Sequence, residues 1–144
     1  MEVVTLIVAA EEGELVDVGE SNAPLEEWSG IEAPGMDTLK IATLHCMLTG
    51  DSLQMALDLY EPDYVSERET VVLRLADELI EKLALLDEEA RGNVASELVA
   101  TEAFEREHWD IDAVLDHLAE LSELAQLAES QGQVLFVWLF FVQT

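Results

Sequence analysis

The chain has 144 residues, half of them hydrophobic, which is enough for one domain with a real core and argues against intrinsic disorder. Asp and Glu total 32 against 6 Lys and Arg, so the formal net charge is −26 at pH 7. This charge disfavours direct binding to nucleic acid phosphates or anionic membranes, and no apolar run is long enough to span a bilayer.

The N-terminal third predicts strands followed by a loop. Residues 2–10 are β-rich and nearly continuous in apolar character, which is typical of a central strand. After a turn at 11–13, Leu15, Val16 and Val18 suggest a short second strand in a hairpin with the first. Residues 19–35 contain clustered Gly, Pro, Ser and Asn, so we expect a loop with one helical turn beside Trp28.

Two helices are expected between residues 37 and 60. Asp37 can cap a helix over 38–48, and Gly50 is suited to end it in a left-handed conformation. Asp51 or Ser52 can cap a shorter helix that runs to about Tyr60, before a proline breaks it.

A capping-box pattern, Ser66-Glu67-Arg68-Glu69, predicts the start of the longest clear helix, which would run to about Leu86. Apolar residues then recur with helical spacing and would form its buried stripe. These residues are Val72, Leu75, Ala76, Leu79, Leu83 and Leu86.

Two further helices begin at aspartates. Asp87 can cap a helix toward residue 99, and Asp110 can cap the last helix, 111–130, which Gly132 is suited to stop. Neither a repeat nor a low-complexity linker interrupts the chain, so residues 1–144 are expected to form a single α+β domain.

The nine consecutive apolar residues from Val134 to Val142 predict a C-terminal strand, because they are rich in β-branched and aromatic side chains. Its expected partner is the N-terminal strand. The fold class is therefore α+β, a small sheet formed by the N- and C-terminal strands and covered by about four to five helices. If one chain cannot cover both faces, the exposed face would drive homodimerisation.

The heptapeptide Leu44-His45-Cys46-Met47-Leu48-Thr49-Gly50 resembles the Leu-His-Phe-x-Leu-Thr-Gly signature of the YfbM-like family of uncharacterised bacterial proteins. The order of elements is similar too, including the segments 85–89 and 131–136. This chain departs from the signature at Cys46, where the family usually has an aromatic residue. The resemblance implies a soluble, mixed α/β bacterial protein and implies no reaction.

The candidate ligand-binding residues are His45, Trp28, Thr49, His108 and Trp109. Each has an alternative structural role. His45 could pack and hydrogen-bond near a helix end, Trp28 could anchor its loop instead of stacking on a ligand, and Trp109 could be a hydrophobic staple before the last helix.

No metal or cofactor is expected. Glu105 and His108 have the Glu-x-x-His spacing of carboxylate-bridged metal sites, but the unit occurs once where such sites need two. Phosphate-binding loops, Cys pairs and nucleophile elbows are absent from the sequence, and the catalytic residues, if any, are unknown. The single cysteine excludes an intrachain disulfide and fits a reducing, cytoplasmic compartment.

Three explanations of the acidity remain open: solubility, adaptation to a salty cytosol, and mimicry of a nucleic acid surface. The composition favours a non-catalytic protein-interaction module that engages basic partners. One alternative is a small enzyme or ligand-binding protein whose pocket gathers His45 and Trp28 with Glu102, Glu105 or His108. The other is an inhibitor that mimics nucleic acid.

Overall fold

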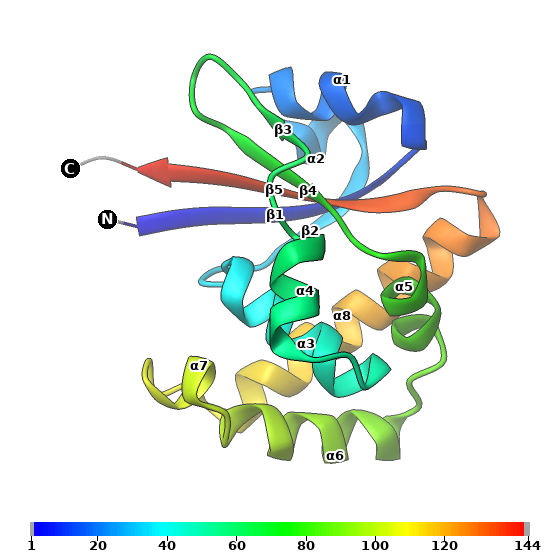
Figure 1. Ribbon diagram of the computed structural model, residues 1–144. Helices are drawn as coiled ribbons and strands as arrows, with labels where there is room; N and C mark the ends of the chain where they lie inside the picture. The colour runs from blue at the N-terminus through cyan, green and yellow to red at the C-terminus, as the bar shows by residue number, and fades with distance from the viewer. Residues whose placement is uncertain (1, 143–144) are drawn as a thin grey trace.

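The two ends of the chain pair as neighbouring strands at the centre of the sheet (Figure 1). In the computed structural model, which describes residues 2–142, strands β1 (Glu2–Ala10) and β5 (Val134–Val142) run antiparallel over their whole length. The pairing sets Glu2 opposite Val142 and Ala10 opposite Val134. This confirms the predicted α+β fold and its terminal strands.

The sheet is larger than the two strands expected from the sequence. Within the described residues it has five antiparallel strands in the order β2-β1-β5-β4-β3. The added strands are β2 (Ser29–Glu32), β3 (Tyr64–Val65) and β4 (Val71–Arg74). Strands β2 and β3 are therefore the two edges.

One face of the sheet packs on the main helical layer. Helices α5 (Asp77–Ala84) and α8 (Ile111–Ser130) contact the strands directly, and α3 (Thr38–Thr49) and α6 (Glu88–Val99) pack against them (Figure 1). The short helices α4 (Leu53–Leu59) and α7 (Glu102–Glu105) complete this layer. Leu135, Val137 and Leu139 of β5 point into its core, with exposures of 1% or less.

A smaller layer covers the opposite face. It consists of a 3-10 turn (Glu12–Glu14), α1 (Leu15–Glu20) and α2 (Pro24–Glu27). Residues of α1 and α2 pack in one cluster with Phe136 and Trp138. The alternation along β5 therefore matches its expected two-faced burial. The sequence predicted a homodimer only if one face of this strand stayed uncovered. Helices lie on both faces, so the buried centre of the strand does not meet that condition.

The expected strand at Leu15–Val18 is wrong, because these residues begin α1. Leu15 and Val18 both pack in the cluster beneath Phe136. Residues three apart share a face of a helix, whereas in a strand they would point to opposite faces. The helix is thus the conformation that buries both.

The expected loop at 19–35 contains β2, which the sequence did not reveal. Its four residues are Ser-Gly-Ile-Glu, and only Ile31 is a good strand former. Pairing with the apolar β1 holds this polar segment extended, so its conformation depends on the partner strand more than on its own composition.

The helix predicted to begin at the capping-box pattern Ser66–Glu69 is also wrong. Ser66 Oγ does accept a hydrogen bond, from the amide of Thr70 at 3.1 Å, but it closes the β3–β4 hairpin instead of opening a helix. Glu69 has φ 65°, which breaks a right-handed helix at that point. The helix that was expected from 66 to 86 is confined to α5, Asp77–Ala84.

The other predicted caps are confirmed. Side chains of Asp37, Ser52, Asp87 and Asp110 accept hydrogen bonds from amides at the starts of α3, α4, α6 and α8. Gly50 ends α3 with φ 86°, a value that a residue without Cβ adopts freely. Among residues 2–142, no helix combines the length and apolar character needed to cross a membrane.

Candidate functional site

The candidate residues from the sequence lie in three separate parts of the molecule. His45 and Thr49 are on α3, Trp28 lies after α2 on the other side of the sheet, and His108 and Trp109 precede α8. His45 is buried and His108 is exposed, and the other three are half-buried. The structure does not bring them into one pocket.

His45 forms a buried hydrogen-bond chain that joins three helices. Its Nε2 lies 2.8 Å from Asp51 Oδ2, and its Nδ1 lies 2.9 Å from the hydroxyl oxygen of Tyr60. The same hydroxyl oxygen accepts a hydrogen bond from the backbone amide of Ala76 at 3.2 Å. An imidazole with its proton on Nε2 satisfies every member, because it donates to Asp51 and accepts from the Tyr60 hydroxyl.

The order carboxylate, imidazole, hydroxyl is that of a nucleophile-activating triad. Here, however, the hydroxyl belongs to Tyr60, which is 1% exposed and cannot meet a substrate. Burial is the main cause that raises the pKa of Tyr60 to about 12, so its nucleophilic anion is disfavoured. The hydrogen-bond chain through His45 therefore holds together the end of α3, the end of α4 and the start of α5.

The neighbours of His45 on α3 also have structural surroundings. Thr49 Oγ1 donates to the carbonyl oxygen of His45 at 2.8 Å, a contact within one helical turn. Burial, assisted by the nearby charge of Asp51, raises the pKa of the Cys46 thiol. A reactive cysteine needs the opposite shift, so nothing at this end of α3 activates a nucleophile.

Trp28 anchors the segment between α2 and β2. Its indole Nε1 donates to Glu14 Oε2 at 3.1 Å, and its ring packs on the cluster that contains Val8 and Phe136. The half-buried ring is thus held on the small helical layer, as expected of the anchoring alternative.

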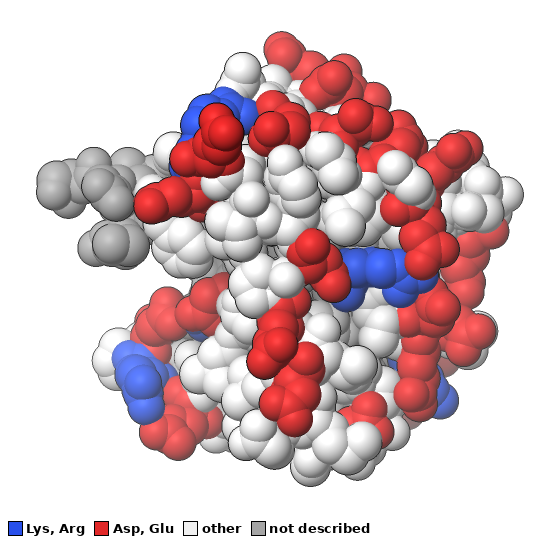
Figure 2. Space-filling view, turned by 45° about the horizontal axis from the view of Figure 1, so that its top comes forward, with Lys and Arg blue, Asp and Glu red and all other residues white. Residues whose placement is uncertain are grey.

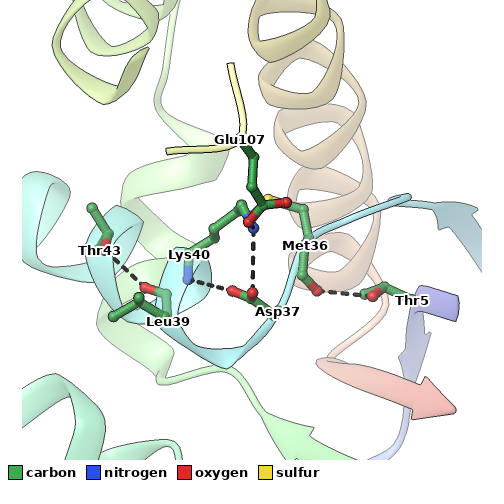
Figure 3. Close-up of polar contacts among 7 residues, drawn as sticks. All are labelled: Thr5, Met36, Asp37, Leu39, Lys40, Thr43 and Glu107. Atoms are coloured by element: carbon green, nitrogen blue, oxygen red, sulfur yellow. Dashed lines mark hydrogen bonds and ion pairs between the residues drawn. The ribbon is translucent and has the colours of Figure 1, made fainter. Parts of the chain in front are cut away.

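Trp109 belongs to a cluster built around a buried lysine, which is drawn in Figure 3 without the tryptophan. Lys40 is 1% exposed, and its Nζ lies 5.6 Å from the centroid of the Trp109 ring. The ammonium forms ion pairs with Asp37, at 3.2 Å, and with Glu107. Phe104 packs edge-on against the same tryptophan, with ring centroids 5.2 Å apart.

This lysine cluster fastens the α7–α8 connection to the start of α3. Both carboxylates are partly solvated, with side-chain exposures of 42% for Asp37 and 49% for Glu107. The positive charge of Lys40 is therefore neutralised at the surface end of the lysine side chain. Thr5 Oγ1 also donates to the Met36 carbonyl oxygen at 2.8 Å, which ties the residue before the cap to β1 (Figure 3). The lysine is fully engaged, and the cluster is structural.

The Glu-x-x-His unit lies on an exposed turn. Glu105 and His108 line a shallow hollow of about 480 Å³ with Glu102 and Arg106, and Arg106 Nη2 pairs with Glu102 Oε1 at 2.7 Å. In the described part of the chain, no three His, Cys, Asp or Glu side chains come close enough together to hold a metal ion.

A groove lies between the edge strand β2 and helix α8. Two adjoining hollows, of about 570 Å³ and about 220 Å³, share Ile31 and Glu120 as lining residues. We call the two hollows together the β2–α8 groove. One wall is Ser29–Glu32 with Pro34, and the other is the side of α8 between Ala113 and Leu127. None of its lining residues is Lys or Arg.

The groove has three carboxylates on its α8 wall and a free backbone edge along β2. The exposed side chains of Asp116, Glu120 and Glu123 line the α8 wall, and Glu32 ends the strand. Strand β1 pairs with only one side of β2, so the other side faces the groove. A negatively charged cleft beside unpaired peptide groups is suited to an extended, positively charged chain.

Sequence reasoning missed this groove because β2 was not recognised. A partial signal was present in α8: Asp112, Asp116 and Glu120 recur every four residues, which places them along one side of a helix. Moreover, no Lys or Arg follows Arg106 in the chain. The spacing identified an acidic helix face but not the strand edge beside it.

Acidic side chains also dominate elsewhere on the surface. Figure 2 shows them spread over the visible face, with few basic side chains, each beside acidic ones. Arg74 lies between Glu12, at 3.5 Å, and Asp77, at 3.0 Å. Arg68 and Arg91 donate to backbone carbonyl oxygens. Together with Lys40 and Arg106, five of the six basic residues therefore have partners within the protein.

Comparison with known proteins gives one structural likeness. No protein-family model and no curated protein matches the chain. Among solved structures, the fold is similar to the crystal structure of YfbM from Escherichia coli, a protein of unknown function. The two share 14% sequence identity over 95% of this chain and 99% of that one, with a TM-score of 0.46.

Proposed function

We propose that this protein is a non-catalytic interaction module that binds basic protein partners through its acidic surface. The observation that carries the proposal is that the basic side chains form their contacts within the protein. Because five of the six contact groups of the same chain, they are not arranged to meet an external anion. In the part of the chain that the structure describes, in contrast, most acidic residues form no ion pair with Lys or Arg.

The uncompensated charge makes a basic partner the favourable one. Unlike charges across an interface accelerate association and set its orientation, whereas a nucleic acid or a second acidic protein would be repelled. Screening at high salt weakens this attraction, since the Debye length falls from about 10 Å at 0.1 M to about 3 Å at 1 M. Binding should therefore be strong at low ionic strength and steeply salt-dependent.

We place this activity in the bacterial cytoplasm. The sequence resemblance to the YfbM-like family implies a bacterial protein, and the lone, half-buried Cys46 is compatible with a reducing compartment. Neither a cofactor nor a metal has a part in the proposal.

Affinity capture from a bacterial lysate tests the proposal. The bait is the full chain, and the matched control is the same chain with six exposed glutamates replaced by glutamine. We expect the bait to retain proteins with basic isoelectric points that elute with rising KCl and that bind again when purified. Partners that are not basic, or that resist elution by salt, would contradict it.

A further inference from the structure

We infer that the β2–α8 groove binds an extended, Lys- or Arg-containing segment of a partner protein, which adds to the sheet as a strand beside β2. This inference rests on the proposed function and names the site at which a basic partner docks. It needs three features: free peptide groups along β2, a defined side for the partner's side chains, and a charge that selects basic residues.

The free peptide groups are those of Gly30 and Glu32. The amide of Ala33 donates to the Thr5 carbonyl oxygen at 2.9 Å, which makes Ala33 and Thr5 a hydrogen-bonded antiparallel pair. Hydrogen-bonded pairs alternate along such a ladder, so Ile31 and Ser29 also direct their peptide groups toward β1.

Gly30 and Glu32 consequently direct their N–H and C=O groups outward, into the groove. Within residues 2–142, no backbone or side-chain hydrogen bond reaches these outward groups. Two amides and two carbonyls, spaced at the strand repeat, are what an incoming strand requires for addition to a sheet edge.

We call the incoming segment of the partner the guest strand. The register also decides which of its side chains face α8. Ile31 packs in the core cluster on the α8 side of the sheet, so Gly30 and Glu32 point to the opposite side. Directly paired residues of neighbouring strands project from the same face. In an antiparallel guest strand, residues that exchange hydrogen bonds with Gly30 and Glu32 therefore point away from α8, and the residues between them point toward it.

The side that faces α8 suits lysine or arginine. Asp116, Glu120 and Glu123 are exposed there, while Ile31 and Leu127 are half-buried and apolar. A long basic side chain can lay its methylene groups on such a floor and keep its charge near the carboxylates. Alternate Lys or Arg residues in an extended segment would therefore meet the acidic wall of α8.

The same features disfavour a second copy of this chain as the occupant. Another β2 would bring its own Glu32 and the acidic wall of its own α8 to a groove that His117 lines but that has no Lys or Arg among its lining residues. Like charges brought together in this way oppose association, and the net charge of −26 adds to the repulsion.

The probe is a synthetic eight-residue peptide that alternates lysine and valine, labelled for fluorescence anisotropy. The full chain should bind it at low salt. N-methylation of the valines should weaken binding about tenfold or more, because valines are the residues whose amides would face β2 when the lysines face α8. N-methylation of the lysines, whose amides would then face solvent, should change the affinity by less than about threefold.

Side-chain variants test the acidic wall. The triple variant Asp116→Asn, Glu120→Gln, Glu123→Gln should lower the affinity about tenfold or more. The matched control removes three exposed carboxylates outside the groove: Glu61→Gln, Glu81→Gln and Glu97→Gln. We expect the control to bind within about threefold of the unmodified protein at the same ionic strength, because its charges are farther from the peptide. Melting curves of both variants establish that they fold.

Amide hydrogen exchange locates the peptide directly. In the free protein the amides of Gly30 and Glu32 should exchange rapidly, while Ile31 is protected by β1. Saturating peptide should slow exchange at Gly30 and Glu32 and leave the already protected Ile31 nearly unchanged. This pattern is expected only if the peptide occupies the edge of β2.

The outcomes separate this inference from the proposed function. If the peptide binds but both triple variants weaken it equally, and Gly30 and Glu32 gain no protection, the acidic surface binds basic chains without a dedicated groove. That result overturns the inference and leaves the proposed function standing. If no binding occurs even at low salt, both fail. If sedimentation instead detects a dimer in which Gly30 and Glu32 are protected, the edge belongs to a second copy, and the inference is wrong.

Discussion

The rings of His45 and Tyr60 meet edge to face inside the helical layer, with centroids 5.4 Å apart and an interplanar angle of 77°. The Tyr60 hydroxyl lies 2.9 Å from His45 Nδ1 and also accepts the Ala76 amide. One phenol thus links α3 to the segment that enters α5. This makes the stability of the fold sensitive to the ionisation of a single tyrosine.

We predict that stability falls at high pH through Tyr60. Its pKa is about 12 in the folded protein and 10 in the reference state, so the unfolded chain loses the proton first as the pH rises. The stabilisation is complete below pH 10 and is lost as the pH approaches 12. The free energy of unfolding should decrease by about 1.4 kcal/mol per pH unit in this window, as measured by urea denaturation.

Tyr60→Phe is the control for this titration. It removes the ionisable group, so the decrease of unfolding free energy above pH 10 should become smaller. At neutral pH the variant should lose about 1–3 kcal/mol, because the Ala76 amide and His45 Nδ1 lose their partner. An unchanged slope in Tyr60→Phe would assign the alkaline loss to other groups.

The buried ammonium of Lys40 predicts an asymmetry between its own removal and the removal of its partner. Glu107→Gln leaves a charge at a position that is 1% exposed with only Asp37 to balance it, and should cost about 1–3 kcal/mol of unfolding free energy. Lys40→Met keeps the packing against Trp109 and frees two carboxylates that are already partly solvated. It should cost less than Glu107→Gln in the same denaturation experiment.

A double variant completes the comparison. With Lys40→Met in place, the further change Glu107→Gln should have almost no effect, because no buried charge remains to be left unpaired. Equal costs of Glu107→Gln in the two backgrounds would show that the ion pair does not couple these residues.

Helix starts were the most predictable part of the fold, because capping is a local interaction. The side chains of Asp37, Asp87 and Asp110 each accept a hydrogen bond from the backbone amide two or three residues later in the chain. Such a contact depends on neighbours in sequence, so a pattern of residues reveals it. The central pairing of β1 with β5 was predictable for a different reason: a continuous apolar strand needs cover on both faces, and the two ends were the best strand candidates.

The errors occurred where tertiary contacts decide the local structure. Ser66 has the chemistry of a helix cap, but the pairing of Val65 with Val71 turns the same side chain into a hairpin closure. Leu15 and Val18 could be strand or helix by composition, and their shared contact with the outer face of β5 selects the helix. Neither contact can be inferred from residues that are close in sequence.

The candidate site was the least predictable part, since it depends on what the fold leaves unoccupied. His45 was chosen for its chemistry, yet both of its ring nitrogens are used inside the protein. The β2–α8 groove consists of residues with no distinctive motif, and its character comes from a strand edge lying beside an acidic helix. Only the arrangement in space reveals such a site.

The β3–β4 hairpin predicts a stabilising substitution. Glu69 has φ 65°, a left-handed conformation that costs energy for a residue with a Cβ atom. Glu69→Gly should raise the free energy of unfolding by about 0.5–1 kcal/mol, the relief of strain being larger than the added entropy of the unfolded chain. Glu67→Gly, which removes the same charge from the same hairpin where no positive φ is present, is the control. Equal effects of the two substitutions would attribute the gain to charge.

Thermal melting against KCl distinguishes the explanations of the acidity. With a net charge of −26, mutual repulsion of the carboxylates destabilises the folded protein, so added salt should raise the melting temperature. If screening alone is responsible, most of the rise should occur below about 0.5 M KCl, where the Debye length has already become shorter than the typical spacing of surface charges. Adaptation to a salty cytosol requires the rise to continue toward about 2 M KCl. A melting temperature that is flat over the whole range would exclude salt adaptation and would show that the carboxylates are too well solvated to destabilise the fold.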